Sequence, residues 1–193
     1  TAQTRTVVTT IYNEAGSPLQ TASTPITINP SSIDTCVQTL TLTSCTLWSM
    51  ATPVRYYAYT RLLSGTTPAD DYVTPFGIRE VKWSATAGMT VNGASVKLKG
   101  ACVHSTLVPA GAATPDEMWE RAVKELKASG CTSIRTAHNM NSPEFYDCCD
   151  QVGIMVMDEY CDKWDTSNGN SHYADFLQVW QKDFTSFIER DRN

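Results

Sequence analysis

Polar and apolar residues alternate along the first 80 residues of the chain. The period-2 pattern is clearest in "TRTVVTTIY" (4–12), "CVQTLTL" (36–42) and "RYYAYTRLL" (55–63), which are rich in β-branched and aromatic side chains. Such alternation is typical of half-buried strands, and the turn-forming stretches "NEAGSP", "NPSS" and "SGTTPADD" separate these segments. The spacing predicts an antiparallel β-sandwich over residues 1–79, with Trp48 in its core. A sugar-stacking platform is the alternative role for Trp48.

The pattern changes after "FGIRE" (76–80). The stretch "MTVNGASVKLKG" predicts a hairpin with a type I′ turn at Asn92-Gly93, inside a joining segment over 81–98. From there, short apolar runs alternate with helical patterns. Continuous apolar runs are typical of parallel strands covered on both faces. We therefore expect three adjacent parallel strands in sequence order, at 100–104, 132–136 and 154–158.

Three amphipathic segments predict the helices that accompany these strands. In "TPDEMWERAVKELKASG" (114–130), Thr114 is the expected N-cap, Glu117 completes a capping box and Gly130 ends the helix. Its expected buried face consists of Trp119, Ala122, Val123 and Leu126. The second helix opens at Ser142-Pro143 and ends near Gly153, and the third has an apolar face of Phe176, Leu177, Trp180, Phe184, Phe187 and Ile188.

Ionisable groups follow all three predicted strands. His104 follows the first, Arg135 and His138 follow the second, and Asp158-Glu159 follows the third. Taken alone, each of these residues is explained as an ordinary loop residue or as part of a structural ion pair. Because functional groups in parallel α/β folds collect at the carboxyl ends of strands, the three together favour one charge-balanced pocket.

Composition limits the classes of partner. The 193 residues are 41% hydrophobic and 18% charged, as in ordinary globular proteins, and the net charge of −5 argues against nucleic acid. No apolar run is long enough to span a membrane, and the amino terminus has no signal-peptide pattern. We expect no cofactor and no bound metal. The compartment stays open, with a secreted or periplasmic location among the options.

The seven cysteines lack metal-type spacing and are odd in number. They are interpreted first as small buried hydrophobic residues, with a single disulfide in the first half as the alternative.

Several stretches together resemble one enzyme family. In order along the chain they are "FGIRE", "VNGASVKLKGACVH", "TPDEMWERAVKELKASGCTSIRTAHN", "SPEFYDCCDQVGIMVMDE" and "RDRN". They resemble glycoside hydrolase family 2, which contains β-galactosidases, β-glucuronidases and β-mannosidases. The resemblance implies a multi-domain β plus α/β architecture. Residues 1–79 would belong to an immunoglobulin-like β-sandwich, and 80–193 to the first three β/α units of a (β/α)8 TIM barrel.

The resemblance also implies roles for site residues. Arg135 matches the arginine that lies beside the nucleophilic glutamate and keeps it ionised. His104 and His138 match histidines that line the sugar subsite. Glu159 is expected at the same strand ends, as a further substrate-binding residue. Trp164 could stack on a sugar face or serve the structure. The resemblance therefore implies a carbohydrate substrate, with a β-galactoside as the default.

The family's two catalytic glutamates have no counterpart here. The acid/base belongs to an Asn-Glu pair after the fourth barrel strand, and the nucleophile follows the seventh. Asp158 and Glu159 cannot replace them, because neighbours on one strand point to opposite faces. We expect a piece of a longer exo-glycosidase that is inactive alone and self-associates through its open barrel edge.

Two alternative hypotheses for the function remain open. The first is a non-catalytic module that binds glycans or a partner protein, and the second is a complete small α/β domain. The "NMN" after His138 and the Ser-Thr after His104 depart from the family pattern, as does Cys45, so sugar specificity is left open.

Overall fold

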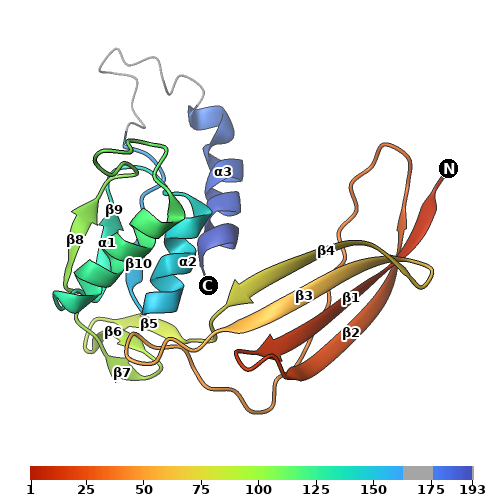
Figure 1. Ribbon diagram of the computed structural model, residues 1–193, viewed down its shortest axis with the longest axis horizontal. Helices are drawn as coiled ribbons and strands as arrows, with labels where there is room; N and C mark the ends of the chain where they lie inside the picture. The colour runs from red at the N-terminus through yellow and green to blue at the C-terminus, as the bar shows by residue number, and fades with distance from the viewer. Residues whose placement is uncertain (163–175, 193) are drawn as a thin grey trace. The chain divides into compact units, whose positions relative to one another are not determined.

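The computed structural model describes residues 1–162 and 176–192 (Figure 1). The chain forms two compact units. One comprises Thr1–Trp48 and Val54–Ile78, and the other comprises Ser49–Pro53 and Arg79–Asn193. Within the described ranges, no helix has both the length and the apolar character needed to cross a membrane.

The first unit is built on one four-stranded antiparallel sheet with the order β2-β1-β3-β4. Its strands are β1 (Gln3–Asn13), β2 (Pro18–Ile28), β3 (Tyr56–Ser64) and β4 (Thr67–Phe76). Hydroxyl pairs stabilise the centre of the sheet, because Thr9 bonds Thr60 and Thr10 bonds Thr21, each at 3.0 Å. Trp48 is 1% exposed, so its expected burial is confirmed.

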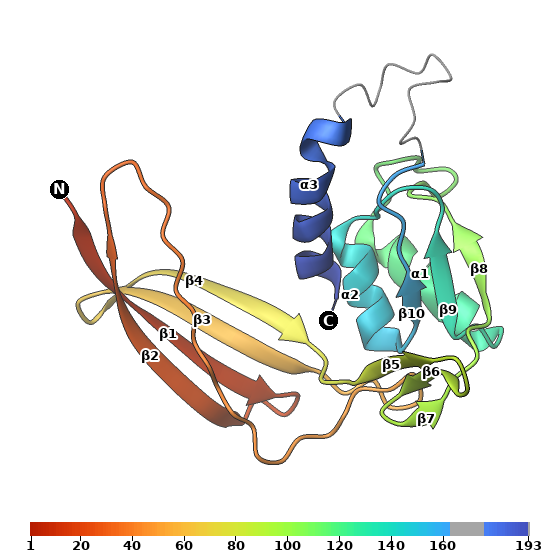
Figure 2. The same ribbon diagram turned by 180° about the vertical axis from the view of Figure 1, so that it is seen from behind.

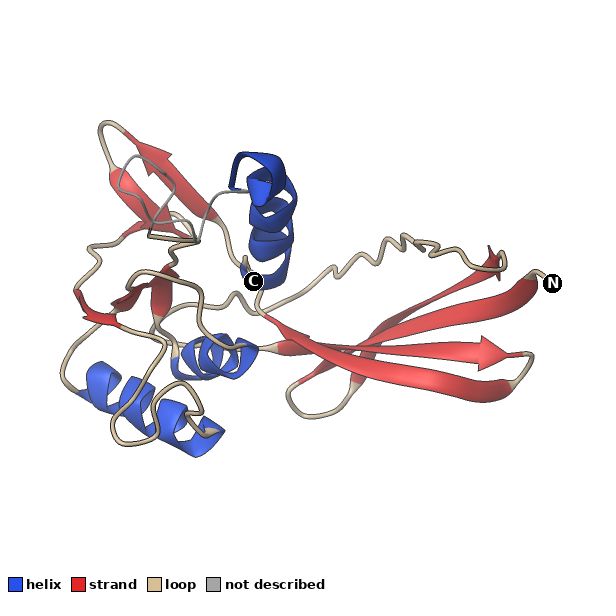
Figure 3. Ribbon diagram, turned by 90° about the horizontal axis from the view of Figure 1, so that it is seen from above, coloured by secondary structure: helices blue, strands red, loops and turns tan. Residues whose placement is uncertain are grey.

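Predictions for this unit hold only in part. The segments at 4–12 and 55–63 are strands, and their antiparallel pairing is confirmed. The strand expected at 36–42 is wrong, since this stretch runs irregularly between β2 and β3 (Figure 3). Its contact with the sheet comes from a side chain, the amide of Gln38, which donates to the Val7 carbonyl at 3.0 Å.

Two further strands were not expected. β2 carries prolines at both 18 and 25, and β4 begins inside the stretch "SGTTPADD" that indicated a turn. Proline and aspartate are rare in strand interiors, and both strands lie at the edges of the sheet, where they are tolerated. The described residues of this unit form one sheet, so the second sheet of the expected sandwich is not found.

The second unit begins with a small antiparallel sheet of β5 (Val81–Ser84), β6 (Gly88–Val91) and β7 (Ala94–Ser95). The predicted hairpin turn is confirmed. Asn92 and Gly93 have φ values of 51° and 80°, as a type I′ turn requires, and Val91 pairs with Ala94 across it.

A three-stranded parallel sheet follows, with the order β10-β9-β8, and confirms the predicted arrangement. Its strands are β8 (Gly100–Val103), β9 (Ser133–Thr136) and β10 (Met155–Met157). The helices are α1 (Asp116–Ala128), α2 (Pro143–Val152) and α3 (Phe176–Asp191). Gly100 lets β8 approach β9 closely, because a Cβ there would lie 1.9 Å from the Ser133 carbonyl oxygen.

Helices α1 and α2 cover one face of this sheet, which we call the covered face (Figure 2). The core between them is made of Trp119, Val123, Ile134, Phe145, Tyr146, Cys149 and Ile154. The expected apolar side of α1 is therefore confirmed for Trp119 and Val123. Neither α1 nor α2 lies over the opposite face of this sheet, which we call the open face (Figure 2).

Other sequence-based details are corrected. Pro115, not Thr114, is the N-cap of α1, and the capping box is absent. The Thr114 hydroxyl instead donates to the Gly111 carbonyl at 2.8 Å, inside the preceding loop.

All seven cysteines are free thiols; only Cys149 is buried and Cys102 is exposed. Their interpretation as buried hydrophobic residues thus applies to Cys149.

Candidate active site

The carboxyl ends of the parallel strands bring four of the expected site residues together. Arg135 is at the end of β9, and Glu159 follows β10. The Arg135 Nε and Nη2 atoms both lie 2.5 Å from Glu159 Oε1. His138 Nδ1 lies 3.4 Å from Glu159 Oε2, and the His104 and His138 rings meet edge to face with centroids 5.5 Å apart. We call these four residues the open-face cluster.

Strand alternation explains why this cluster lies on the open face. Ile134 of β9 packs into the core under the helices, so its neighbour Arg135 points the other way. The Arg135 side chain is 40% exposed and that of Glu159 is 26% exposed. The Ala137–His138 peptide bond, which precedes the histidine of the cluster, is cis.

The electrostatics keep Arg135 charged. Its hydrogen bond to Glu159 raises the pKa of the guanidinium above the ordinary value, with a smaller contribution from Cys102. Arg135 Nη1 lies 3.6 Å from the sulfur of Cys102 on β8. The ion pair fixes one guanidinium edge and leaves a partly exposed cation on the open face.

A hollow of about 570 Å³ adjoins the open-face cluster. It is lined by Arg135, His138, Glu159, Tyr160, Cys161, Asp162, Phe176, Trp180 and Phe184. Phe176 and Trp180 stack with centroids 6.4 Å apart. Charged groups beside aromatic rings are a combination that suits sugars, which present hydroxyls at their edges and apolar faces for stacking.

The sequence interpretation did not identify several residues near this end of the sheet. Phe176, Trp180 and Phe184 of α3 were expected on the apolar face of a helix, and their place in the lining of the hollow was not predicted. Cys102 was treated as a buried hydrophobic residue, although alternation from the Val103 position would have placed it beside Arg135. Thr136 and Tyr146, which bond Asp158, were also not singled out. Trp164 lies outside the described residues.

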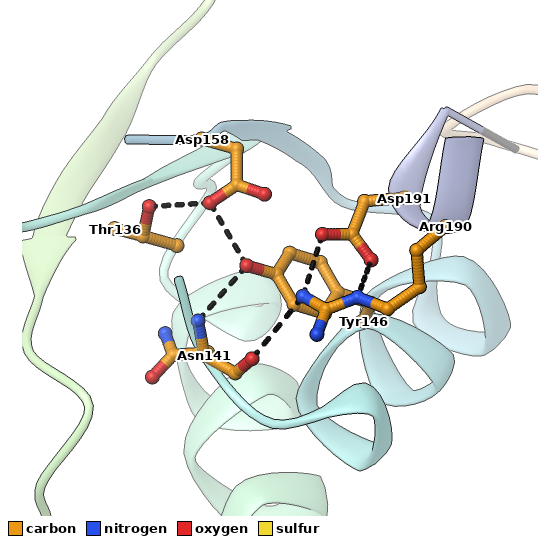
Figure 4. A network of polar contacts seen from close by, with 6 residues as sticks. All are labelled: Thr136, Asn141, Tyr146, Asp158, Arg190 and Asp191. Atoms are coloured by element: carbon orange, nitrogen blue, oxygen red, sulfur yellow. Dashed lines mark hydrogen bonds and ion pairs between the residues drawn. The ribbon is translucent and has the colours of Figure 1, made fainter. Parts of the chain in front are cut away.

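The neighbouring carboxyl group, Asp158, points to the covered face (Figure 4). Its Oδ1 accepts hydrogen bonds from the hydroxyls of Thr136 and Tyr146, at 2.7 Å and 2.8 Å. Burial raises the pKa of Asp158, whereas these two hydrogen bonds oppose the rise. The two adjacent carboxylates therefore belong to different environments. Among the described residues, no group of three or more His, Cys, Asp and Glu side chains could hold a metal ion.

Comparison with known proteins gives concordant matches. A sequence profile for the TIM barrel domain of glycosyl hydrolases family 2 matches residues 83–182. The chain is 39% identical over 157 residues to β-galactosidase BoGH2A of Bacteroides ovatus, a match that covers 81% of this chain and 18% of that protein.

Solved structures agree with the sequence matches. A family 2 glycosyl hydrolase from Bacteroides cellulosilyticus superposes with a TM-score of 0.85 at 31% identity, over 100% of this chain and 26% of the other. The β-glucuronidase of Bacteroides uniformis gives a TM-score of 0.77 at 27% identity, over 83% of this chain and 20% of the other. The chain thus spans about a quarter or less of each of these proteins.

Proposed function

Because this chain belongs to glycosyl hydrolase family 2, we propose that its second unit supplies the sugar-binding wall of a retaining exo-glycosidase. A β-galactoside is the proposed substrate, since the relative from Bacteroides ovatus is a β-galactosidase; a β-glucuronide is the alternative, as in the enzyme from Bacteroides uniformis. The observation that carries the proposal is the open-face cluster at the carboxyl ends of three parallel strands, where barrel enzymes place their chemistry.

Each member of the cluster has a proposed role. Arg135 lies beside the nucleophilic carboxylate during the reaction and lowers that group's pKa by its positive charge. His104 and His138 donate or accept hydrogen bonds with sugar hydroxyls, and such bonds strengthen as the oxocarbenium-like transition state forms. Glu159 holds the guanidinium of Arg135 in place. Trp164 stays a proposed stacking residue.

The 193-residue polypeptide is proposed to be inactive alone. Retaining glycosidases need two carboxyl groups about 5–5.5 Å apart that flank the scissile bond. Glu159 is held by Arg135, and Asp158 is directed to the opposite face by Thr136 and Tyr146. These two adjacent groups therefore cannot face one glycosidic bond together.

The domain assignment is part of the same proposal. Residues 1–79 would be the end of an immunoglobulin-like domain, and residues 80–193 the first three units of a TIM barrel. The open face and the free edges of β8 and β10 would let copies of the isolated polypeptide associate. Light scattering on the pure chain should find a dimer or larger species, and a monomer at all concentrations would contradict this.

A segment exchange tests the enzymatic role. Residues 83–182 would replace the matching segment of β-galactosidase BoGH2A, and nitrophenyl β-galactoside hydrolysis would be measured. We expect activity in the exchanged enzyme, and we expect Arg135→Ala to lower kcat about 10²-fold or more with a smaller change in KM. Arg121→Ala is the matched control, because Arg121 pairs with Glu125 on the exposed side of α1.

The outcomes of the exchange are distinct. If Arg135→Ala leaves kcat unchanged in a folded, exchanged enzyme, the role assigned to Arg135 is wrong. Separately, the pure 193-residue chain should not hydrolyse nitrophenyl galactoside, glucuronide or mannoside. Sustained turnover by that chain would mean that Glu159 or another of its carboxylates acts in catalysis.

A further inference from the structure

We propose that Thr136 and Asp158 are positioning residues: together they fix the backbone of Glu159 so that its carboxylate meets Arg135. This inference rests on the proposed function, in which a correctly placed Arg135 acts on the substrate site. It concerns residues on the covered face, which touch neither the open-face cluster's hollow nor any substrate placed there.

The direction of each hydrogen bond gives the first step. The backbone N–H of Glu159 donates to Thr136 Oγ1 at 2.8 Å. The Thr136 hydroxyl has one proton, and it donates that proton to Asp158 Oδ1 at 2.7 Å. Thr136 thus bonds both residues that follow β10, one through the backbone and one through the side chain. We call this arrangement the threonine bracket.

A second hydroxyl holds Asp158 from α2. The backbone N–H of Asn141 donates to the Tyr146 oxygen at 2.9 Å, so the phenolic proton is directed to Asp158 Oδ1 at 2.8 Å (Figure 4). The Arg190 guanidinium lies over the Tyr146 ring, 5.2 Å from its centroid, and donates to the Asn141 carbonyl at 3.4 Å. Elements α2 and α3 therefore both contribute to the position of Asp158.

Burial makes the bracket specific. Thr136 is 0% exposed and Tyr146 is 8% exposed, so neither hydroxyl can exchange its partner for bulk water without a local opening.

The threonine bracket acts on the backbone of Glu159. Residue 159 follows the parallel ladder of β9 and β10, which ends at the Met157–Arg135 pair. Beyond that pair, the Thr136 hydroxyl supplies the contact that β9 makes with the Glu159 backbone.

The bracket therefore links the two faces of the sheet. On the covered face it fixes the Glu159 N–H, and on the open face the Glu159 carboxylate receives both Nε and Nη2 of Arg135. If the Thr136 acceptor is lost, Glu159 can rotate about its backbone and the ion pair loses its fixed geometry. Serine keeps the hydroxyl, whereas valine has nearly the same shape without it.

The test uses NMR on the 193-residue chain without any sugar. Thr136→Val should increase the water exchange of the Arg135 Nε–H about fivefold to tenfold, the effect of losing one hydrogen bond, and should move that signal toward the shift of an unpaired arginine. Thr136→Ser should restore both readouts. Thr185→Val is the control, because the Thr185 hydroxyl donates to the Gln181 carbonyl within its own helix, α3.

A measurement on the unaltered chain covers the case in which Thr136→Val does not fold. The Glu159 amide should then exchange with solvent at least about tenfold more slowly than in an unstructured peptide. Unprotected exchange of that amide, or a folded Thr136→Val chain with an unchanged Arg135 signal, would overturn the proposal. Failure of the glycosidase function would instead appear in the segment exchange, and would leave these sugar-free readouts unaffected.

Discussion

The covered and open faces of the parallel sheet treat two adjacent carboxylates in opposite ways. On the covered face, Asp158 is bonded by two hydroxyls under the helices. On the open face, Glu159 is bonded by a cation and borders a hollow. The two groups are neighbours in the extended segment that follows β10, where side chains alternate between faces. For these two carboxylates, position along the chain, more than residue type, decides which one stabilises the fold and which one faces the hollow.

The largest expected effect is a difference in stability between a variant on the covered face, Asp158→Ala, and one on the open face, Glu159→Ala. Asp158→Ala leaves the hydroxyl protons of Thr136 and Tyr146 without an acceptor in a buried setting, which should lower the free energy of unfolding of the second unit by about 3 kcal/mol. Glu159→Ala should leave it nearly unchanged, because the Arg135–Glu159 pair is partly exposed. Urea unfolding monitored by tryptophan fluorescence measures both. Equal losses in the two variants would remove the distinction between the faces.

The alkylation rates of Cys102 and Cys149 are expected to differ by about 100-fold, with Cys102 the faster. Cys149 packs in the core on the covered side and is 1% exposed, and burial raises the pKa of its thiol well above the usual range. Cys102 on the open face is exposed. Brief alkylation with iodoacetamide followed by peptide mass spectrometry should therefore label Cys102 and spare Cys149. Labelling of Cys149 in the folded chain at the rate of Cys102 would contradict the assigned burial.

A smaller effect is the pH dependence that comes from Asp158. Burial raises its pKa above the ordinary value of 3.8, so the folded chain binds this proton more tightly than the unfolded chain does. Its contribution to stability is therefore full below pH 3.8 and declines as the pH rises through the raised pKa.

The matched variant for this pH effect is Asp158→Asn, which has no proton to lose. Subtracting its stability profile from that of the unaltered chain isolates the Asp158 contribution. The difference should fall with rising pH in the acidic range, by less than the loss in Asp158→Ala. A difference that rises with pH would mean that Asp158 is stabilised as an anion.

Much of the second unit could be predicted because its signals are local. Apolar runs identified the three parallel strands, and Asn92-Gly93 identified the hairpin turn. The first unit was harder, because β2 and β4 are edge strands whose pairing depends on partners, not on their own composition. The stretch 36–42 alternates like a strand but has no strand partner.

The candidate site divides in the same way. Residues at strand ends, such as Arg135 and Glu159, could be found by position along the chain. The threonine bracket could not, because it depends on a hydroxyl from β9 and on Tyr146 from the middle of α2. A polar residue on a buried helix face is ambiguous until its partner is known.

An NMR titration of the chain with galactose and with glucuronate tests most directly whether the open face binds a sugar. The ring signals of His104 and His138 report on the open face, and those of Tyr146 report on the covered face. We expect saturable shifts of both histidine rings with at least one sugar, smaller in Arg135→Ala, while the Tyr146 ring signals stay unchanged. Shifts confined to Tyr146, or histidine rings that respond to neither sugar, would contradict this expectation.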